Sequence, residues 1–225
     1  GSAEIPGEEI GQPLVIRDDI EIEEPRHGEV LVRVAHCGVC HSDLSLVDGV
    51  MPSATPTVLG HEAAGVVEAL GPGVTTLEVG DHVVLSPCAP CGHCPWCIRG
   101  EWSLCTNGDA LIFATHPDGG TRLSRNGETV YRGLAVAAFA EHVIIQETGA
   151  VKIPHEVPLD DQVCPALHGP EETRLIVRSP GALGPSLIPV HPRAAHEAER
   201  RVEALLHPLR PKVRLPGTRS ALSLD

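Results

Sequence analysis

Short runs of apolar, often β-branched residues recur along the first part of the chain, and residues that favour turns separate them. The clearest runs are 14–24 (LVIRDDIEIEE), 29–35 (EVLVRVA), 63–70 (AAGVVEAL) and 81–86 (DHVVLS). Such runs, bounded by Gly, Pro and Asp, are typical of β-strands rather than helices. The pattern therefore predicts a mostly β fold with few helices, arranged as a barrel.

Two later segments continue this pattern after a long interruption. Strand-like runs resume at 137–146 (AAFAEHVIIQ) and 150–154 (AVKIP). The interruption, residues 106–133, is polar and contains Asn-Gly, Gly-Gly and Pro-Asp pairs, which favour turns. We expect this stretch to run over the surface of the barrel as an excursion.

The chain changes character after Cys164. Residues 165–225 hold nine of the 21 prolines, no aromatic residue and no cysteine, and nothing there alternates like a strand. Only 193–207 has the apolar spacing of an amphipathic helix. We predict two parts: a domain over 1–164, and a divergent Pro/Arg-rich tail over 165–225 that is irregular or partly helical.

Composition narrows the class of protein. Seventeen Lys and Arg against 30 Asp and Glu give a formal net charge of -13, which argues against nucleic acid or an anionic membrane as a partner. No apolar run approaches the roughly 18–20 residues that span a bilayer, and no basic-then-apolar leader opens the chain. We therefore expect a cytoplasmic protein. Aromatic residues are only 2% of the chain, so the core must consist mainly of Val, Ile, Leu and Ala.

The cysteines are clustered, which favours a metal over disulfides. The stretch CGHCPWCIRGEWSLC has the spacing C-x2-C-x2-C-x7-C. Four thiolates at such short steps can surround one tetrahedral zinc ion. The candidate ligands are Cys91, Cys94, Cys97 and Cys105. They predict a zinc-binding lobe.

A fifth cysteine in this region leaves an alternative open. Together with Cys91, Cys94 and Cys97, Cys88 completes a C-x2-C ladder that superficially resembles an iron–sulfur ligand run. The ladder lacks the final three-residue step followed by Pro that bacterial ferredoxins use. We favour zinc, and expect Cys88 to be a spare buried thiol.

A second candidate site lies upstream of the lobe. In HCGVCHSD, residues 36–43, a predicted strand ends just before Cys40; in GHEAAG, residues 60–65, His61 and Glu62 lie between glycines. Cys and His are two of the ligands that catalytic zinc uses while keeping one position open. As an alternative, Cys37 and Cys40 could form a redox dithiol. Such dithiols usually accompany a thioredoxin-like βαβ pattern, which is absent here.

The motifs occur in an order that resembles the zinc-dependent medium-chain alcohol dehydrogenases. GVCHSD is followed by GHEAAG, GDHV, the four-cysteine lobe, VKIP and PLD. The resemblance covers roughly residues 10–164. The long excursion is similar to the class III and aryl-alcohol branches of that family. The resemblance implies a GroES-like catalytic domain.

The resemblance also implies residue roles. Cys40 and His61 would bind the catalytic zinc, and the carboxylates of Asp43 and Glu62 would orient these ligands, with Glu62 also a candidate ligand itself. Ser42 would take the proton of the alcohol, and His41 would contact the pyrophosphate of NAD or NADP. The structural zinc would be held by four residues: Cys91, Cys94, Cys97 and Cys105.

The sequence departs from the family pattern at three points. Ser45 stands where the family often has the His that completes a proton relay. The third zinc ligand, usually a Cys in a Gly-Cys step after PLD, has only Cys164 and His168 as nearby candidates. The tail shows no recognisable Rossmann domain, because GALGPS at 181–186 lacks the G-x-G-x-x-G spacing.

Two hypotheses about function follow. The first is a zinc-dependent oxidoreductase that oxidises a primary or secondary alcohol, or reduces the aldehyde or ketone, by hydride transfer to NAD(P). Its partner would be a small alcohol or aldehyde, and the family is generally homo-oligomeric. The alternative is a non-catalytic zinc-binding barrel, or a truncated or frameshifted fragment, in which only the structural zinc site is intact.

Overall fold

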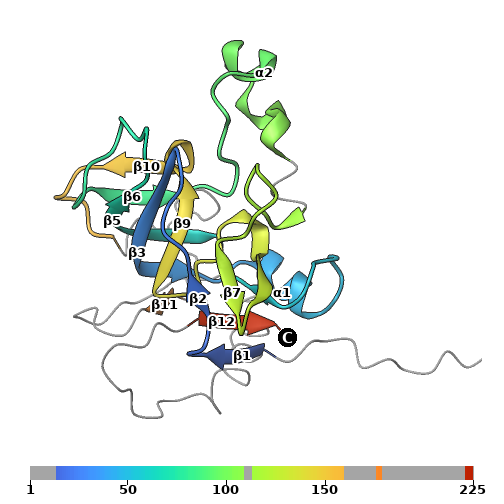
Figure 1. Cartoon of the computed structure of the whole chain (residues 1–225). Helices are drawn as coiled ribbons and strands as arrows, with labels where there is room; N and C mark the ends of the chain where they lie inside the picture. The colour runs from blue at the N-terminus through green and yellow to red at the C-terminus, as the bar shows by residue number, and fades with distance from the viewer. Residues whose placement is uncertain (1–13, 109–112, 160–175, 179–220, 225) are drawn as a thin grey trace, which may run out of the picture.

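The computed structural model of the chain describes residues 14–108, 113–159, 176–178 and 221–224. These residues form a mostly β body with a small lobe that projects from it at the top of Figure 1. The predicted fold, a mostly β barrel with few helices and a cysteine lobe, is confirmed. The predicted helix at 193–207 lies outside the described residues, as do Cys164 and His168.

The strands follow the apolar runs closely, because alternating side chains place one face in the core. Their bounds are β1 Leu14–Arg17, β2 Glu21–Ile22, β3 Glu29–Gly38, β4 Thr57–Val58, β5 Glu62–Leu70, β6 His82–Leu85, β7 Leu123–Arg125, β8 Glu128–Arg132, β9 His142–Gln146, β10 Ala150–Ile153, β11 Ile176–Arg178 and β12 Ala221–Leu224.

The helical elements are short. They are α1 His41–Val47 and α2 Pro95–Ile98, with single 3-10 turns η1 Trp102–Leu104, η2 Thr106–Gly108, η3 Gly133–Ala135 and η4 Glu147–Gly149. The helix α1 was not predicted from the sequence. It buries Leu44, Leu46 and Val47, while its exposed positions are polar.

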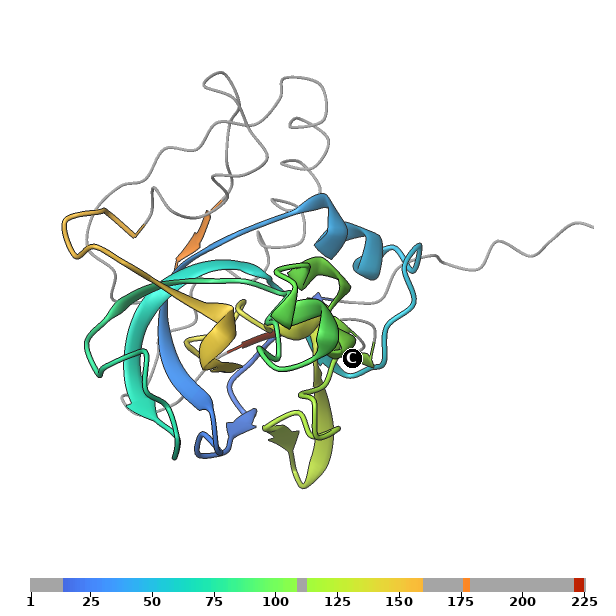
Figure 2. The same ribbon diagram turned by 90° about the horizontal axis from the view of Figure 1, so that it is seen from above.

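Strand β3 is the centre of the larger sheet, whose order is β10-β6-β5-β3-β11. Its first half also pairs with β9, and all these pairings are antiparallel. The pairing with β5 shifts register twice, between Leu31 and Val32 and between Val34 and His36. Such irregularities increase bending and twist. Figure 2 shows these strands curving around the body.

The second sheet has the order β1-β12-β4-β8-β7-β2, with β4 parallel to β8. Two strands from beyond Cys164 take part in the sheets: β12 pairs with β1 and β4, and β11 pairs with the end of β3. The alternation pattern had indicated no strand there. Short backbone pairing along an available sheet edge does not require an alternating sequence.

The core between the sheets is aliphatic, as the composition predicted. Val30, Val32 and Val34 of β3 pack with residues from β5, β6 and β9, and Phe139 is the one aromatic residue among the buried residues of this cluster. By contrast, Trp96 and Trp102 are exposed on the lobe.

The stretch 106–133 is not a surface excursion throughout, so that prediction was wrong in part. It contains the β7–β8 hairpin, and the side chains of His116, Arg122 and Arg132 are almost fully buried. They surround buried Glu29, whose carboxylate accepts from Arg122 Nη2 at 2.7 Å and Nε at 3.1 Å. Polar residues that neutralise one another can be buried, and sequence polarity does not reveal this.

The charge cluster also determines the state of its histidine. Burial, together with the positive charges of Arg132 and Arg122, lowers the pKa of His116 to about 2. His116 is therefore neutral, although its Nδ1 lies 3.3 Å from Glu29 Oε1. The cluster thus contains a neutral imidazole beside a buried carboxylate–guanidinium pair.

Candidate metal centres

The first centre begins where β3 ends and α1 starts. Cys40 is the N-cap of α1, and the Asp43 side chain accepts a hydrogen bond from the Cys40 backbone N–H at 3.1 Å. The backbone N–H of Asp43 donates to the carbonyl of Cys40. This capping arrangement fixes the first turn of the helix and, with it, the position of Cys40.

The second segment of this centre enters β5. Gly60 has a φ of +90°, a conformation that L side chains rarely adopt. Its N–H donates to Asp43 Oδ1 at 3.0 Å, and His61 Nδ1 lies 3.3 Å from the same oxygen. Asp43 is only 2% exposed. One buried carboxylate therefore connects the Cys40 turn to the His61 segment.

Three potential ligand atoms meet at this point. Those of Cys40, His61 and Glu62 all lie within 4.8 Å of one another, and each residue is half-buried. A thiolate, an imidazole and a carboxylate are the ligand types that zinc takes, at about 2.0–2.3 Å. The donor set therefore fits a zinc ion.

The electrostatics of His61 reflect its anionic neighbours. Burial by itself lowers its pKa, but hydrogen bonds with the side chains of Asp43 and Cys40 outweigh burial and raise the pKa to about 10. Without a metal, His61 is therefore protonated at neutral pH. A metal ion would replace that proton, because an imidazole must be deprotonated to coordinate.

The remaining predicted residues lie around α1. Ser42 Oγ is 3.6 Å from Cys40 Sγ. His41 is exposed, and Ser45 Oγ donates to the His41 carbonyl at 3.0 Å and lies 3.4 Å from His41 Nδ1. The structure thus brings Cys40, Ser42 and the His61 segment together, whereas His41 faces outward beside Ser45.

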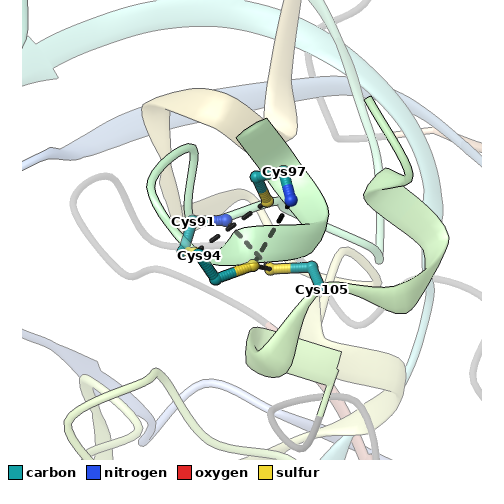
Figure 3. Close-up of side chains that lie close together, drawn as sticks. All are labelled: Cys91, Cys94, Cys97 and Cys105. Atoms are coloured by element: carbon teal, nitrogen blue, oxygen red, sulfur yellow. Dashed lines mark hydrogen bonds between the residues drawn. The ribbon is translucent and has the colours of Figure 1, made fainter. Parts of the chain in front are cut away.

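The second centre is the lobe around α2. The sulfurs of Cys91, Cys94, Cys97 and Cys105 lie within 4.8 Å of one another, and the four side chains point toward one another (Figure 3). Cys94 is the N-cap of α2, and its sulfur accepts from the Cys97 N–H at 3.4 Å. The Cys105 sulfur accepts from the N–H groups of Cys91 and Asn107.

The thiols of the lobe differ in how readily they ionise. Backbone N–H groups of Thr106 and Cys97 lower the pKa of Cys94 to about 5. Burial and the neighbouring sulfurs raise the pKa of Cys97 to about 12. In the metal-free lobe, Cys94 is therefore ionised at neutral pH, whereas Cys97 stays protonated. The positive charge of a bound zinc ion would offset the charge of the thiolates and so favour deprotonation of the remaining thiols.

Two of the described cysteines stand outside both centres. Cys88 is exposed, so the prediction of a buried thiol was wrong. Its backbone N–H donates to Ser86 Oγ. Cys88 thus lies on the segment that joins the barrel to the lobe, ahead of the four clustered cysteines in the sequence. Cys37 is 1% exposed and donates to the Gly38 carbonyl. It is a free thiol and is not a member of the group formed by Cys40, His61 and Glu62.

Alkylation should separate these thiols. In the zinc-loaded protein we expect iodoacetamide to label Cys88 first among the described cysteines, because it is exposed. Cys37 should stay unlabelled until the protein unfolds, since burial raises its pKa well above the ordinary value and keeps the thiolate scarce. Peptide mass spectrometry over time would measure both rates. Equal labelling of Cys37 and Cys88 in the folded protein would contradict the expectation.

The geometry defines a class of protein: a GroES-like β-barrel that carries a half-buried Cys–His–Glu cluster and a four-cysteine lobe. Residues 26–155 match the model of the alcohol dehydrogenase GroES-like domain. The chain therefore belongs to the alcohol dehydrogenase GroES-like domain family.

Individual relatives agree with this assignment. The chain is 39% identical over 153 residues to an NDMA-dependent alcohol dehydrogenase of Amycolatopsis methanolica, covering 68% of this chain and 41% of that protein. It is 40% identical over 151 residues to an S-(hydroxymethyl)glutathione dehydrogenase of Synechocystis, covering 64% and 40%. The chain thus spans about two fifths of the length of these relatives.

Solved structures give the same picture. An alcohol dehydrogenase zinc-binding domain protein from Burkholderia ambifaria is similar with a TM-score of 0.59 and 45% identity, over 63% of this chain and 39% of that one. Benzyl alcohol dehydrogenase from Acinetobacter calcoaceticus has a TM-score of 0.58 and 36% identity, over 64% and 38%. Within the described residues of our chain, no helix is long and apolar enough to cross a membrane.

Proposed function

We propose that this chain supplies the zinc-binding catalytic part of an alcohol dehydrogenase-type oxidoreductase. The reaction would oxidise a primary or secondary alcohol, or reduce the corresponding aldehyde or ketone, with NAD(P) as the hydride acceptor or donor. The carrying observation is the convergence of Cys40, His61 and Glu62 within 4.8 Å, joined through the buried carboxylate of Asp43.

In this proposal Cys40, His61 and Glu62 would hold the catalytic zinc, and the four lobe cysteines the structural zinc. The catalytic zinc would act as a Lewis acid that polarises the oxygen of the alcohol or carbonyl. Asp43 would keep the His61 ring oriented, because a carboxylate on the second ring nitrogen fixes the tautomer of a ligating imidazole.

The roles around α1 complete the proposal. Ser42, 3.6 Å from Cys40 Sγ, would accept the proton that leaves the substrate hydroxyl. His41 is exposed at the start of α1, where it would contact the cofactor pyrophosphate. The residues that the structure describes contain no strand, glycine-rich turn and helix in series of the kind that binds dinucleotides.

The names of the relatives guide the choice of substrates. The relatives include an S-(hydroxymethyl)glutathione dehydrogenase and a benzyl alcohol dehydrogenase. These would correspond to the class III and aryl-alcohol branches that the sequence resemblance implied. We propose that the substrate comes from one of these two kinds of alcohol. Both should therefore be tested with NAD and with NADP.

Zinc content is the decisive experiment. Elemental analysis of the purified chain, with its concentration fixed independently, is expected to give about two zinc ions per chain. A His61→Ala variant should retain about one, because it removes one of three ligands from the first centre and none from the lobe. NAD(P)H formation with the two alcohols should be abolished in the same variant.

The controls separate the alternatives. His93→Ala removes an exposed imidazole of the lobe, whose Nδ1 hydrogen-bonds to the Cys91 carbonyl, and it should keep both zinc ions. One zinc per chain in the unmutated protein, unaffected by His61→Ala, would refute the catalytic zinc site and favour a barrel with a structural zinc alone. Iron with visible charge-transfer absorbance would instead support the iron–sulfur alternative.

A further inference from the structure

A short segment before β9 lies against the entry to β5. We call residues 133–139 the strap. Leu134, Ala135 and Ala137 of the strap have φ values of 50°, 63° and 67°, the left-handed region that residues with a Cβ seldom occupy. Strain of this kind persists only where surrounding contacts impose it.

The strap holds Gly60 from one side. The N–H of Ala138 donates to the Gly60 carbonyl and the N–H of Phe139 donates to the Leu59 carbonyl, each at 2.8 Å. A Cβ on Gly60 would lie 2.5 Å from the Phe139 backbone nitrogen and 2.6 Å from its ring. Phe139 is 6% exposed, so its ring is packed in place. There is therefore no room for the backbone at Gly60 to shift toward the strap.

The opposite side of Gly60 is held by Asp43. The Gly60 N–H donates to Asp43 Oδ1, the same oxygen that lies beside His61 Nδ1. The residue immediately before His61 is thus fixed through its N–H, its carbonyl and its Cα face. The backbone of His61 is therefore restricted, and its side chain is kept close to Cys40 and Glu62.

The strap itself is anchored by a buried cation. The guanidinium of Arg132 donates to the carbonyls of Thr115, Ala135 and Ile144, and the side chain is 4% exposed. These bonds connect the strap to β9 and to the segment before the β7–β8 hairpin. Contacts therefore run continuously from Arg132 through the strap to Gly60.

We propose that Phe139 is a positioning residue for His61. The Phe139 ring and the backbone of the strap hold Gly60 and so fix the backbone from which His61 reaches Cys40 and Glu62. The inference rests on the proposed function, because a positioned His61 matters for metal binding. Phe139 itself would act through Gly60 and would not coordinate the metal.

The test compares Phe139→Leu with Ile145→Val, which trims a buried residue of the same core at a distance from Gly60 in the contacts described. Zinc affinities of both centres are measured by competition with a chelator, so that the four-cysteine lobe is an internal reference. In Phe139→Leu we expect the affinity of the His61 centre to fall about tenfold or more, as when support of a metal ligand is lost, while the lobe keeps its affinity. Ile145→Val should change neither. Phe139→Met serves if Phe139→Leu fails to fold.

A second readout does not depend on the catalytic zinc. Hydrogen exchange of the peptide that contains Gly60 and His61 should be at least several-fold faster in Phe139→Leu than in Ile145→Val, with only the lobe loaded. A chain that binds zinc only in the lobe would refute the proposed function, while faster exchange would still support the positioning role. Equal weakening of both centres, equal effects of the two variants, or unchanged exchange at Gly60 would overturn the inference.

Discussion

A Cys94→Ser variant is expected to lose the zinc of the four-cysteine lobe and, with it, the folded lobe. Cys94 is buried, forms the N-cap of α2 and has the thiol pKa that backbone N–H groups lower to about 5. A serine hydroxyl does not ionise at neutral pH and is a poor zinc ligand. Structural zinc sites contribute roughly 10–16 kcal/mol to folding, so losing one of four thiolates should be a large effect.

The lobe depends on the metal because it has almost no core of its own. Between residues 88 and 108 the buried side chains are those of Cys94 and Cys97. The large apolar residues there are exposed: Ile98 at 76%, Trp102 at 64% and Leu104 at 54%. Its helix α2 has four residues, far fewer than a helix needs to be stable alone. Coordination of the sulfurs is therefore the main interaction that can order this segment.

Elemental analysis and limited proteolysis would measure the loss. Cys94→Ser should bind one zinc fewer than the unmutated chain and be cut within the lobe while the barrel stays intact. Cys88→Ser is the matched control, since Cys88 is an exposed thiol three residues from Cys91 and outside the cluster. Unchanged zinc content in Cys94→Ser, or an equal loss in Cys88→Ser, would be incompatible with the proposed ligand set.

The sequence predicted the features that depend on local spacing. The steps between the lobe cysteines are short, so a compact turn is enough to bring their sulfurs to one ion. The alternation in β3 and β5 likewise predicted strands, because it reflects one buried face. The ligand types suggested Cys40 and His61 as a zinc pair, and the resemblance to a family strengthened this prediction. The structure supplies its physical basis in Asp43, whose carboxylate hydrogen-bonds to both segments.

What the sequence could not predict depends on long-range pairing. Glu29 and Arg122 are 93 positions apart, and nothing local marks either as buried. The parallel pairing of β4 with β8 and the docking of β12 on β1 join segments whose own patterns are too short to indicate a partner. Helix α1 was not predicted because it has only seven residues and its first three belong to the motif GVCHSD, which was interpreted for its metal ligands. Its capping box, with Asp43 at the third helical position, was the available signal.

Glu29→Gln is expected to destabilise the barrel by about 3–5 kcal/mol, the usual cost of breaking a buried ion pair. Glu29 is 1% exposed and Arg122 3%, and two hydrogen bonds of 2.7 and 3.1 Å join them. The carboxylate also accepts from the Arg26 N–H and from Gln146 Nε2. Within the described part of the chain, its replacement leaves the guanidinium with only Asp118 as an acidic partner.

Urea unfolding would measure this loss against three further variants: Glu23→Gln, Arg122→Met and the double variant Glu29→Gln with Arg122→Met. Glu23→Gln breaks a pair with Arg26 that is about half exposed on both sides, and it should cost less than about 1 kcal/mol. The double variant Glu29→Gln with Arg122→Met removes both charges of this pair, and it should lose clearly less than the sum of the two single variants, because neither partner is then left buried without the other. Additive losses would show that the two residues act independently, and the 106–133 stretch would then be held to the barrel by other contacts.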